Sequence, residues 1–316
     1  MNISFAVTVT RVTYMRTPTN FFLFSLAVSD SLFLTSAIGE KLFRIMSSSI
    51  ARNEGISSSV GCMIRSLIVD TSYYASLFII TLVTLEKYHA VCQPIKQVTQ
   101  RGKRRAIRCI TLTWILSFLI SCTLTPLCMR RMVTCMYWPP YIKYLHLPGY
   151  YTTFEPIDAM FYYSSFCQSV PFFVTMIVNA IVYFRLIRAL GDQVATTEQR
   201  GQDPERTNRI RHLVVRMLII NGAAFFLLLA PFEIIVLSGA IADIRGDGLF
   251  DDQADQGRLV YTLVRTLTYV NAVINSAIYW VSNKRYRDAF ALTYTRSCSH
   301  SGGLRTTSSL GRETSR

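Results

Sequence analysis

One long apolar segment of this chain carries different chemistry at its two ends. Glu86-Lys87-Tyr88 places an acid, a base and a phenol side by side at one end, and Cys62 lies 25 residues upstream of Lys87. At about 1.5 Å of rise per helical residue these ends are roughly 38 Å apart, more than the ~30 Å hydrocarbon core of a bilayer. The segment therefore predicts a membrane-crossing helix with a cysteine outside and a charged cluster that addresses a cytosolic partner inside.

The composition is that of a membrane protein. Of the 316 residues, 51% are hydrophobic and 16% are charged, whereas soluble domains carry about 25% charged residues. Six apolar runs are long enough to span a bilayer, at 20–46, 59–92, 106–128, 159–187, 212–243 and 257–281. A shorter run at 2–14 predicts only the inner half of a first helix, so we expect the chain to be truncated at its amino terminus.

The basic residues predict the orientation of the chain. Four segments, 11–20, 86–108, 185–216 and 284–316, hold 23 of the 33 Lys and Arg but only 7 of the 19 Asp and Glu. Basic loops stay in the cytoplasm, so these segments and the carboxyl tail are predicted to be cytoplasmic. Because the basic residues flank apolar spans, we expect membrane lipids rather than nucleic acid to account for the positive charge.

The eight cysteines favour a disulfide over a metal site. They form no CxxC pair and are not interleaved with histidines, so no metal site is indicated. Cys62 and Cys135 both fall on the outer, oxidising side, where a disulfide is permitted. Cys128 competes with Cys135 as the partner of Cys62.

Further motifs follow in a set order, namely Asn2, Met15-Arg16-Thr17-Pro18-Thr19-Asn20, Leu26-Ala27-Val28-Ser29-Asp30, Trp114, Pro171, Pro231 and Asn275-Ser276-Ala277-Ile278-Tyr279. With Cys62 and Glu86-Lys87-Tyr88, they resemble the rhodopsin-like (class A) G-protein-coupled receptors, particularly the peptide-receptor branch. The stretch from Arg16 to Asp30 is similar to thyrotropin-releasing-hormone-like and FMRFamide-like neuropeptide receptors.

The resemblance implies an all-α membrane protein, a seven-transmembrane-helix bundle whose first helix is incomplete, without enzymatic activity. We expect a multi-pass plasma-membrane protein with a receptor domain at 1–295 and a flexible cytoplasmic tail at 296–316. The expected helices lie at about 2–15, 20–46, 59–92, 103–128, 159–190, 207–243 and 257–281, followed by a short amphipathic interfacial helix at 283–295. The disulfide would tie the third helix to an aromatic outer loop, 129–158.

Asp30 is an acid in the middle of an apolar helix, where a charge is costly and usually functional. The resemblance places it with Ser76, Asn271 and Asn275 in a water-filled pocket that binds sodium in many relatives. The alternative is a neutral, hydrogen-bonded Asp30 inside a packed bundle.

Five ionisable residues fall in the outer halves of apolar helices. Such groups usually face a cavity, which indicates a polar ligand pocket that carries both signs of charge. They are Glu40, Arg65, Asp70, Glu233 and Arg265. The alternative is a set of internal salt bridges, such as Glu40 with Arg65 or Arg265.

The resemblance assigns activation and G-protein contact to a set of inner residues: Glu86, Lys87, Tyr88, Phe225, Pro231 and Tyr279. Four positions depart from the family pattern. Lys87 replaces an arginine and loses its planar fork of donors, Leu229 replaces a tryptophan, Ser276 replaces the proline of NPxxY, and Asn179 replaces a tyrosine.

The leading interpretation is a receptor that couples an extracellular peptide, most simply a neuropeptide, to heterotrimeric G proteins. The four departures leave open a receptor-derived protein with impaired signalling, and polar helix interiors leave open a transporter. Val69 stands where amine receptors have an aspartate, and Tyr269 stands where opsins have a lysine. The sequence therefore favours neither an amine receptor nor an opsin. In the tail, Cys298 is a palmitoylation candidate, and Thr306, Thr307, Ser308 and Ser309 form a phosphorylatable cluster suited to arrestin.

Overall fold

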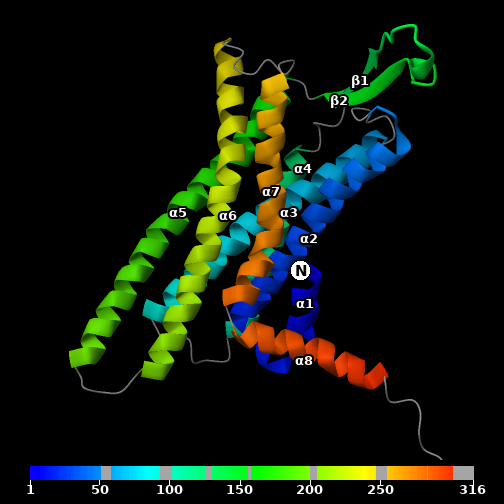
Figure 1. Cartoon of the computed structure of the whole chain (residues 1–316). Coiled ribbons are helices and arrows are strands. Elements are labelled where there is room, and N and C mark those ends of the chain that lie inside the picture. The colour runs from blue at the N-terminus through cyan, green and yellow to red at the C-terminus, as the bar shows by residue number, and fades with distance from the viewer. Residues whose placement is uncertain are drawn as a thin grey trace, which may run out of the picture.

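The computed structural model describes residues 1–50, 58–92, 102–124, 130–155, 158–199, 205–246, 255–282 and 284–301. Its elements are α1 (Asn2–Arg11), η1 (Thr13–Met15), α2 (Pro18–Ser47), α3 (Ser59–Cys92), α4 (Gly102–Leu124), β1 (Arg130–Cys135), η4 (Ile142–Tyr144), β2 (Tyr150–Glu155), α5 (Asp158–Gln199), α6 (Glu205–Arg245), α7 (Asp255–Ser282) and α8 (Lys284–Ser301). The long helices form one bundle, with α8 crossing one end and the β1–β2 hairpin projecting at the other (Figure 1).

The helices turn apolar side chains outward, as membrane helices do. Within the described residues, α2, α3, α4, α5 and α6 are each long and apolar enough to cross a membrane. On α4, Leu112 and Leu119 are 66% and 57% exposed, while Thr113, Ser117 and Ser121 are buried. An apolar face of this kind is unfavourable in water and suited to lipid, with every helical backbone group bonded internally.

The start of α2 shows how the sequence fixes a helix end. Pro18 occupies the first helical turn, where its missing N–H removes no helical hydrogen bond. The Thr17 side chain accepts a hydrogen bond from the Asn20 backbone N–H at 3.3 Å and so caps the helix.

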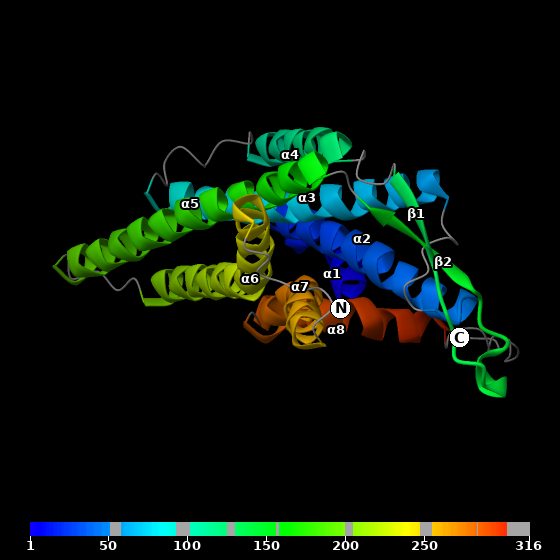
Figure 2. The ribbon, with the colours of Figure 1, turned by 90° about the horizontal axis from the view of Figure 1, so that it is seen from above.

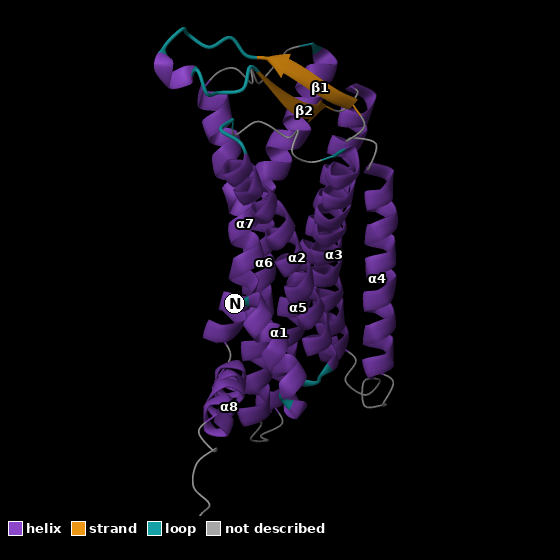
Figure 3. Ribbon diagram, turned by 90° about the vertical axis from the view of Figure 1, so that its right-hand side faces the viewer, coloured by secondary structure: helices purple, strands orange, loops and turns teal. Residues whose placement is uncertain are grey.

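The helix α3 is the central element of the bundle. It contacts α2, α4, α5 and α6, and Tyr74, Ala75, Leu77 and Ile79 on it are at most 1% exposed. The helix α4 stands at the outer edge beside α3 (Figure 3). Tyr74 and its neighbours therefore form the core against which the functional side chains of the other helices pack.

The predicted fold class is confirmed, with some different boundaries. The helix α5 continues to Gln199 and α6 begins at Glu205, so most of the stretch 191–206, which separates the predicted helices 159–190 and 207–243, is helical. No proline lies between Pro171 and Pro204, which permits the longer helix. The helix α8 reaches Ser301 rather than 295, and the predicted tail residues 302–316 lie outside the described residues.

The outer loop at 129–158 forms an antiparallel hairpin, which the sequence did not predict. Arg130 pairs with Glu155 and Cys135 with Tyr150. At its tip, Trp138 donates to the Pro148 carbonyl at 2.9 Å. Seen from above, the hairpin extends to one side of the bundle (Figure 2). The tip is therefore held by its own contacts.

Candidate functional site

A cavity of about 90 Å³, lined by both apolar and polar side chains, lies among α2, α3, α5, α6 and α7. Asp70 and Arg265, predicted as ligand contacts, line it together with Asp30, Ser76 and Asn271 of the predicted sodium pocket. Members of two sets that the sequence treats separately therefore share one cavity, whereas Glu40, Arg65, Glu233 and Asn275 are not among its lining residues.

Asp30 is buried, with 2% of its surface exposed. Its carboxylate accepts hydrogen bonds from Ser76 Oγ at 3.0 Å and from Asn275 Nδ2 at 2.8 Å. The side-chain oxygens of Asn271 and Asn275 are buried and have no hydrogen-bond partner within the described part of the chain. A carboxylate beside two buried amide oxygens that lack donors is a set of ligands suited to a hard cation such as sodium.

The outer acid Glu40 is committed to two internal ion pairs. Its carboxylate contacts Arg44 on its own helix and Arg65 on α3. Of the two readings that the sequence left open, the internal salt bridge between Glu40 and Arg65 is the one found. This pair joins the outer ends of α2 and α3.

Asp70 and Arg265 present opposite charges to the cavity. Both line its wall, Asp70 from α3 and Arg265 from α7. The Arg265 guanidinium carbon also lies 4.7 Å from the centre of the Phe232 ring, a cation–π contact. A ligand that reaches this wall meets both signs of charge.

Glu233 is fully buried on α6 and its carboxylate is surrounded by donors. Tyr73 Oη donates to it at 2.8 Å, Gln168 Nε2 at 3.0 Å and Ser169 Oγ at 3.0 Å. These bonds join α6 to α3 and α5. Tyr73, Gln168 and Ser169 were not singled out from the sequence, because a single polar residue in an apolar helix does not reveal its partner.

At the inner end, the acid and base of α3 turn toward α2. Lys87 Nζ donates to Thr19 Oγ1, Thr19 Oγ1 donates to Glu86 Oε2 at 2.9 Å, and Lys87 lies 3.9 Å from Glu86. The neighbouring Tyr88 packs instead against Leu186 and Val215 of α5 and α6. Glu86 and Lys87 therefore contact α2, whereas the next residue, Tyr88, contacts α5 and α6.

Ser276, which stands where the family motif has a proline, bonds α7 to α1. Its hydroxyl donates to Asn2 Oδ1, and Asn2 Nδ2 donates to the Ala272 carbonyl at 2.7 Å. The helix α7 runs without interruption through Ser276. Three residues later, Tyr279 Oη accepts from Asn221 Nδ2 at 2.8 Å, which joins α7 to α6.

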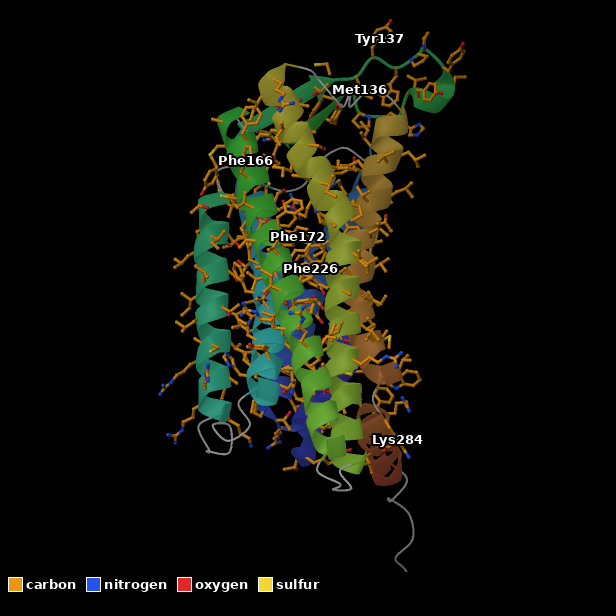
Figure 4. All side chains as sticks on the ribbon, turned by 90° about the vertical axis from the view of Figure 1, so that its left-hand side faces the viewer. Met136, Tyr137, Phe166, Phe172, Phe226 and Lys284 are labelled. Carbon is orange, nitrogen blue, oxygen red and sulfur yellow. The ribbon has the colours of Figure 1, made fainter. Side chains whose placement is uncertain are left out.

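The predicted α6 residues lie in an aromatic layer. Phe225 is 1% exposed and its ring centre is 5.3 Å from that of Phe226. Phe226 meets Phe172 of α5 at 5.7 Å, and the two rings lie one above the other where α5 and α6 meet (Figure 4). Pro231 lies within α6, which continues as a helix on both sides of it.

The predicted pairing of Cys62 with Cys135 is wrong. Cys62 is disulfide-bonded, whereas Cys135 at the end of β1 is an exposed, free cysteine. The register of the hairpin pairs Cys135 with Tyr150 at the tip side of the strands, away from the end of the hairpin that joins the bundle. Cys128, the competing partner, lies outside the described residues, as do the side chain of Cys298 and the cluster Thr306–Ser309.

The helix α8 has the predicted amphipathic character. Tyr286 and Ala289 are buried, while Lys284 and Arg287 are exposed. Tyr286 Oη donates to Asn20 Oδ1, which joins α8 to α2.

These features define a seven-helix membrane receptor, and sequence comparison gives its family. Residues 1–279 match the family described as "7 transmembrane receptor (rhodopsin family)". The chain therefore belongs to the rhodopsin-family G-protein-coupled receptors and is a multi-pass membrane protein without enzymatic activity. The predicted class is confirmed.

The chain is similar to several neuropeptide receptors. It is 27% identical to human Neuromedin-U receptor 2 over 87% of this chain and 63% of that protein. It is 25% identical to the Pyrokinin-1 receptor of Drosophila melanogaster, over 92% and 75% of the two chains, and 26% identical to a Caenorhabditis elegans Neuromedin U receptor homolog, over 88% and 72%. The chain thus spans less than two thirds of the human relative. The narrower likeness to thyrotropin-releasing-hormone and FMRFamide receptors stays a prediction.

Proposed function

We propose that this chain transduces the binding of an extracellular neuropeptide to heterotrimeric G proteins at the plasma membrane. The observation that carries the proposal is the single cavity that joins Asp70 and Arg265 to Asp30, in a chain with the ordered motifs of the family. A ligand at the outer part of such a cavity can change the packing around Asp30 and, through α7, the contacts at Tyr279.

The cavity wall favours a peptide over a small apolar ligand. Asp70 and Arg265 offer one carboxylate and one guanidinium, which suit a ligand that has both acceptors and donors. The hairpin above adds exposed aromatic and aliphatic residues, including Tyr137 at 96%, Tyr141 at 65% and Ile142 at 87%. Such side chains supply contact area to peptides. Neuromedin U and pyrokinins, the peptides that appear in the names of the relatives, are the first peptides to test.

Sodium is the proposed ion at Asp30. The oxygen ligands of the ion would be the Asp30 carboxylate, the Ser76 hydroxyl and the amide oxygens of Asn271 and Asn275. A bound cation would neutralise the buried carboxylate and hold α2, α3 and α7 together.

Activation is proposed to release the inner cluster. In the resting arrangement Lys87 is held by Thr19 and Glu86, and outward movement of α6, hinged near Pro231, would open the surface where Lys87 and Tyr88 meet a G protein. Arrestin binding at Thr306–Ser309, palmitoylation of Cys298 and contact of the basic inner segments with anionic lipids remain predictions of the same scheme.

The test is expression with promiscuous G proteins and a neuropeptide library that includes neuromedin U and pyrokinins, with calcium release as the readout. We expect a response to one peptide that Lys87→Ala abolishes without loss of surface expression. Loss of the response in Asp70→Asn and Arg265→Gln, with Glu40→Gln unaffected, would locate the ligand on the cavity wall.

A second candidate is a receptor-derived protein that no longer signals. It is favoured by Lys87, which lacks the arginine fork and is occupied by Thr19 and Glu86. Silence to every peptide despite normal surface expression would overturn the first proposal in favour of this one.

A further inference from the structure

Tyr183 of α5 lies between two other helices, α3 and α6, in the inner half of the bundle. Its hydroxyl accepts a hydrogen bond from Thr84 Oγ1 of α3 at 3.0 Å. On its other side is Gly222 of α6, where an added Cβ would fall 1.7 Å from Tyr183 Oη, 2.6 Å from Cζ and 3.1 Å from Cε2. All three nearest atoms belong to one side chain, so Tyr183 fills the space that the absence of a side chain at Gly222 leaves on α6.

The preceding residue, Asn221, joins the same turn of α6 to a different helix. Asn221 Nδ2 donates to Tyr279 Oη of α7 at 2.8 Å. This turn of α6 is therefore held to α5 by a steric fit and to α7 by one hydrogen bond.

Asn179, one turn before Tyr183, does not duplicate this contact. Its Nδ2 donates to Thr81 Oγ1 and to the Thr175 carbonyl, both at 2.8 Å, which are on α3 and on its own helix. Among the hydrogen bonds of the described residues, that side chain makes none to α6. Asn179 and Tyr183 both bond α5 to α3, and of the two it is Tyr183 that also fits against α6.

We infer that Tyr183 and Gly222 form a latch that holds the inner part of α6 against α5 and α3 in the resting receptor. Movement of α6 away from the bundle requires the Tyr183 ring to leave the glycine, and a larger residue at 222 requires either the ring to swing aside or the two helices to separate. The inference rests on the proposed signalling function, because in a signalling receptor this latch sets the level of G-protein activation without ligand. Tyr183 acts as a positioning residue, since it holds helices and contacts no ligand.

The test measures the separation of the inner helix ends directly. Spin-labelled non-natural amino acids at the exposed positions Lys103 of α4 and Arg216 of α6 give a distance distribution without labelling native cysteines. Gly222→Ala is expected to shift the ratio of long to short distances roughly tenfold, since overpacking is strongly unfavourable at a close contact. Gly39→Ala is the matched control, because a Cβ there meets no atom within 4 Å in the described structure, and it should leave the distribution unchanged.

A double substitution tests whether the effect passes through Tyr183. Tyr183→Ala alone should shift the distribution partly, and adding Gly222→Ala to it should change nothing further, because the clashing ring is gone. If Gly222→Ala does not fold, Thr84→Val provides the second variant, with a smaller shift in the same direction. The inference is overturned if Gly222→Ala behaves like Gly39→Ala, or if it shifts the distances equally with and without Tyr183.

Basal G-protein activation of the same variants separates the two proposals. We expect Gly222→Ala to raise activity without ligand in the order of the distance shifts. A distance shift without any activation by any G protein would leave the latch standing and count against the signalling function.

Discussion

Two buried acids of the bundle, Asp30 and Glu233, look alike in the sequence and differ in the structure. Each stands alone in an apolar helix, and each is at most 2% exposed. Glu233 receives three donors from Tyr73, Gln168 and Ser169. Asp30 receives two, from Ser76 and Asn275, and lines a cavity.

The difference lies in what surrounds each carboxylate. Around Glu233 the neighbouring groups are donors, which satisfy the acid and tie three helices together. Beside Asp30 the side-chain oxygens of Asn271 and Asn275 have no partner within the described residues, so the cluster has acceptors in excess. The three donors tie Glu233 to α3 and α5, whereas the amide oxygens that lack a partner within the described residues are the observation on which the proposed cation site at Asp30 rests.

The largest effect is expected at Glu233. Replacing it with Leu leaves three buried donors without an acceptor, at about 1–3 kcal/mol of stability. The midpoint of thermal unfolding in detergent should fall clearly. Glu233→Gln keeps one acceptor oxygen, so its unfolding midpoint should fall less. Equal midpoints for Glu233→Leu and the unaltered protein would contradict the role of Glu233 in joining the helices.

The Asp30 cluster is tested by the ion itself. Sodium should stabilise the unaltered protein relative to equimolar choline, by about 1.4 kcal/mol at ten times its dissociation constant. Asp30→Asn should remove this dependence, because the carboxylate that pairs with the cation is lost. Glu233→Gln should retain it, and a sodium effect that survives Asp30→Asn would place the ion elsewhere.

A smaller effect is expected at Ser276, on the helix that carries Asn275. Ser276→Ala removes the hydrogen bond to Asn2 and should lower stability by about 0.5–1.5 kcal/mol. Thermal unfolding of Ser276→Ala and Ser276→Thr distinguishes the loss of the hydroxyl from a change of volume. If both variants unfold alike, the hydrogen bond is not what stabilises this position.

The smallest effect is expected at the outer acid Glu40. Glu40 and Arg65 remain 15% and 30% exposed, so Glu40→Gln should change stability by only about 0.5 kcal/mol. The change should shrink further in high salt, because partly exposed ion pairs are screened. A loss of stability as large as that at Glu233 would show that solvent exposure does not determine how much the interactions of these two acids stabilise the protein.

Much of the fold follows from local patterns that the sequence contains. The positions of α2 and α3 were predicted to within about two residues, because an apolar run bounded by Pro18 or by Cys62 and a charged cluster has few alternatives. Both ends of α6 were also predicted to within two residues, whereas α5, predicted to end at 190, continues to Gln199, since polar residues beyond the membrane fit a helix and a loop equally well. The disulfide was mispredicted because sidedness permits both Cys128 and Cys135, and only the register of the hairpin separates Cys135 from Cys62.

The sequence by itself determined that this chain is a helical membrane protein of the rhodopsin-like class, with its polar residues at a few interior positions. Those conclusions rest on apolar length, basic flanks and motif order, which are properties of the chain alone. Only the tertiary structure decided which interior residues meet: Glu40 with Arg65, Glu233 with Tyr73, and Tyr183 with Gly222. The physical reason is that a buried polar group is defined by its partner, and its partner lies on another helix.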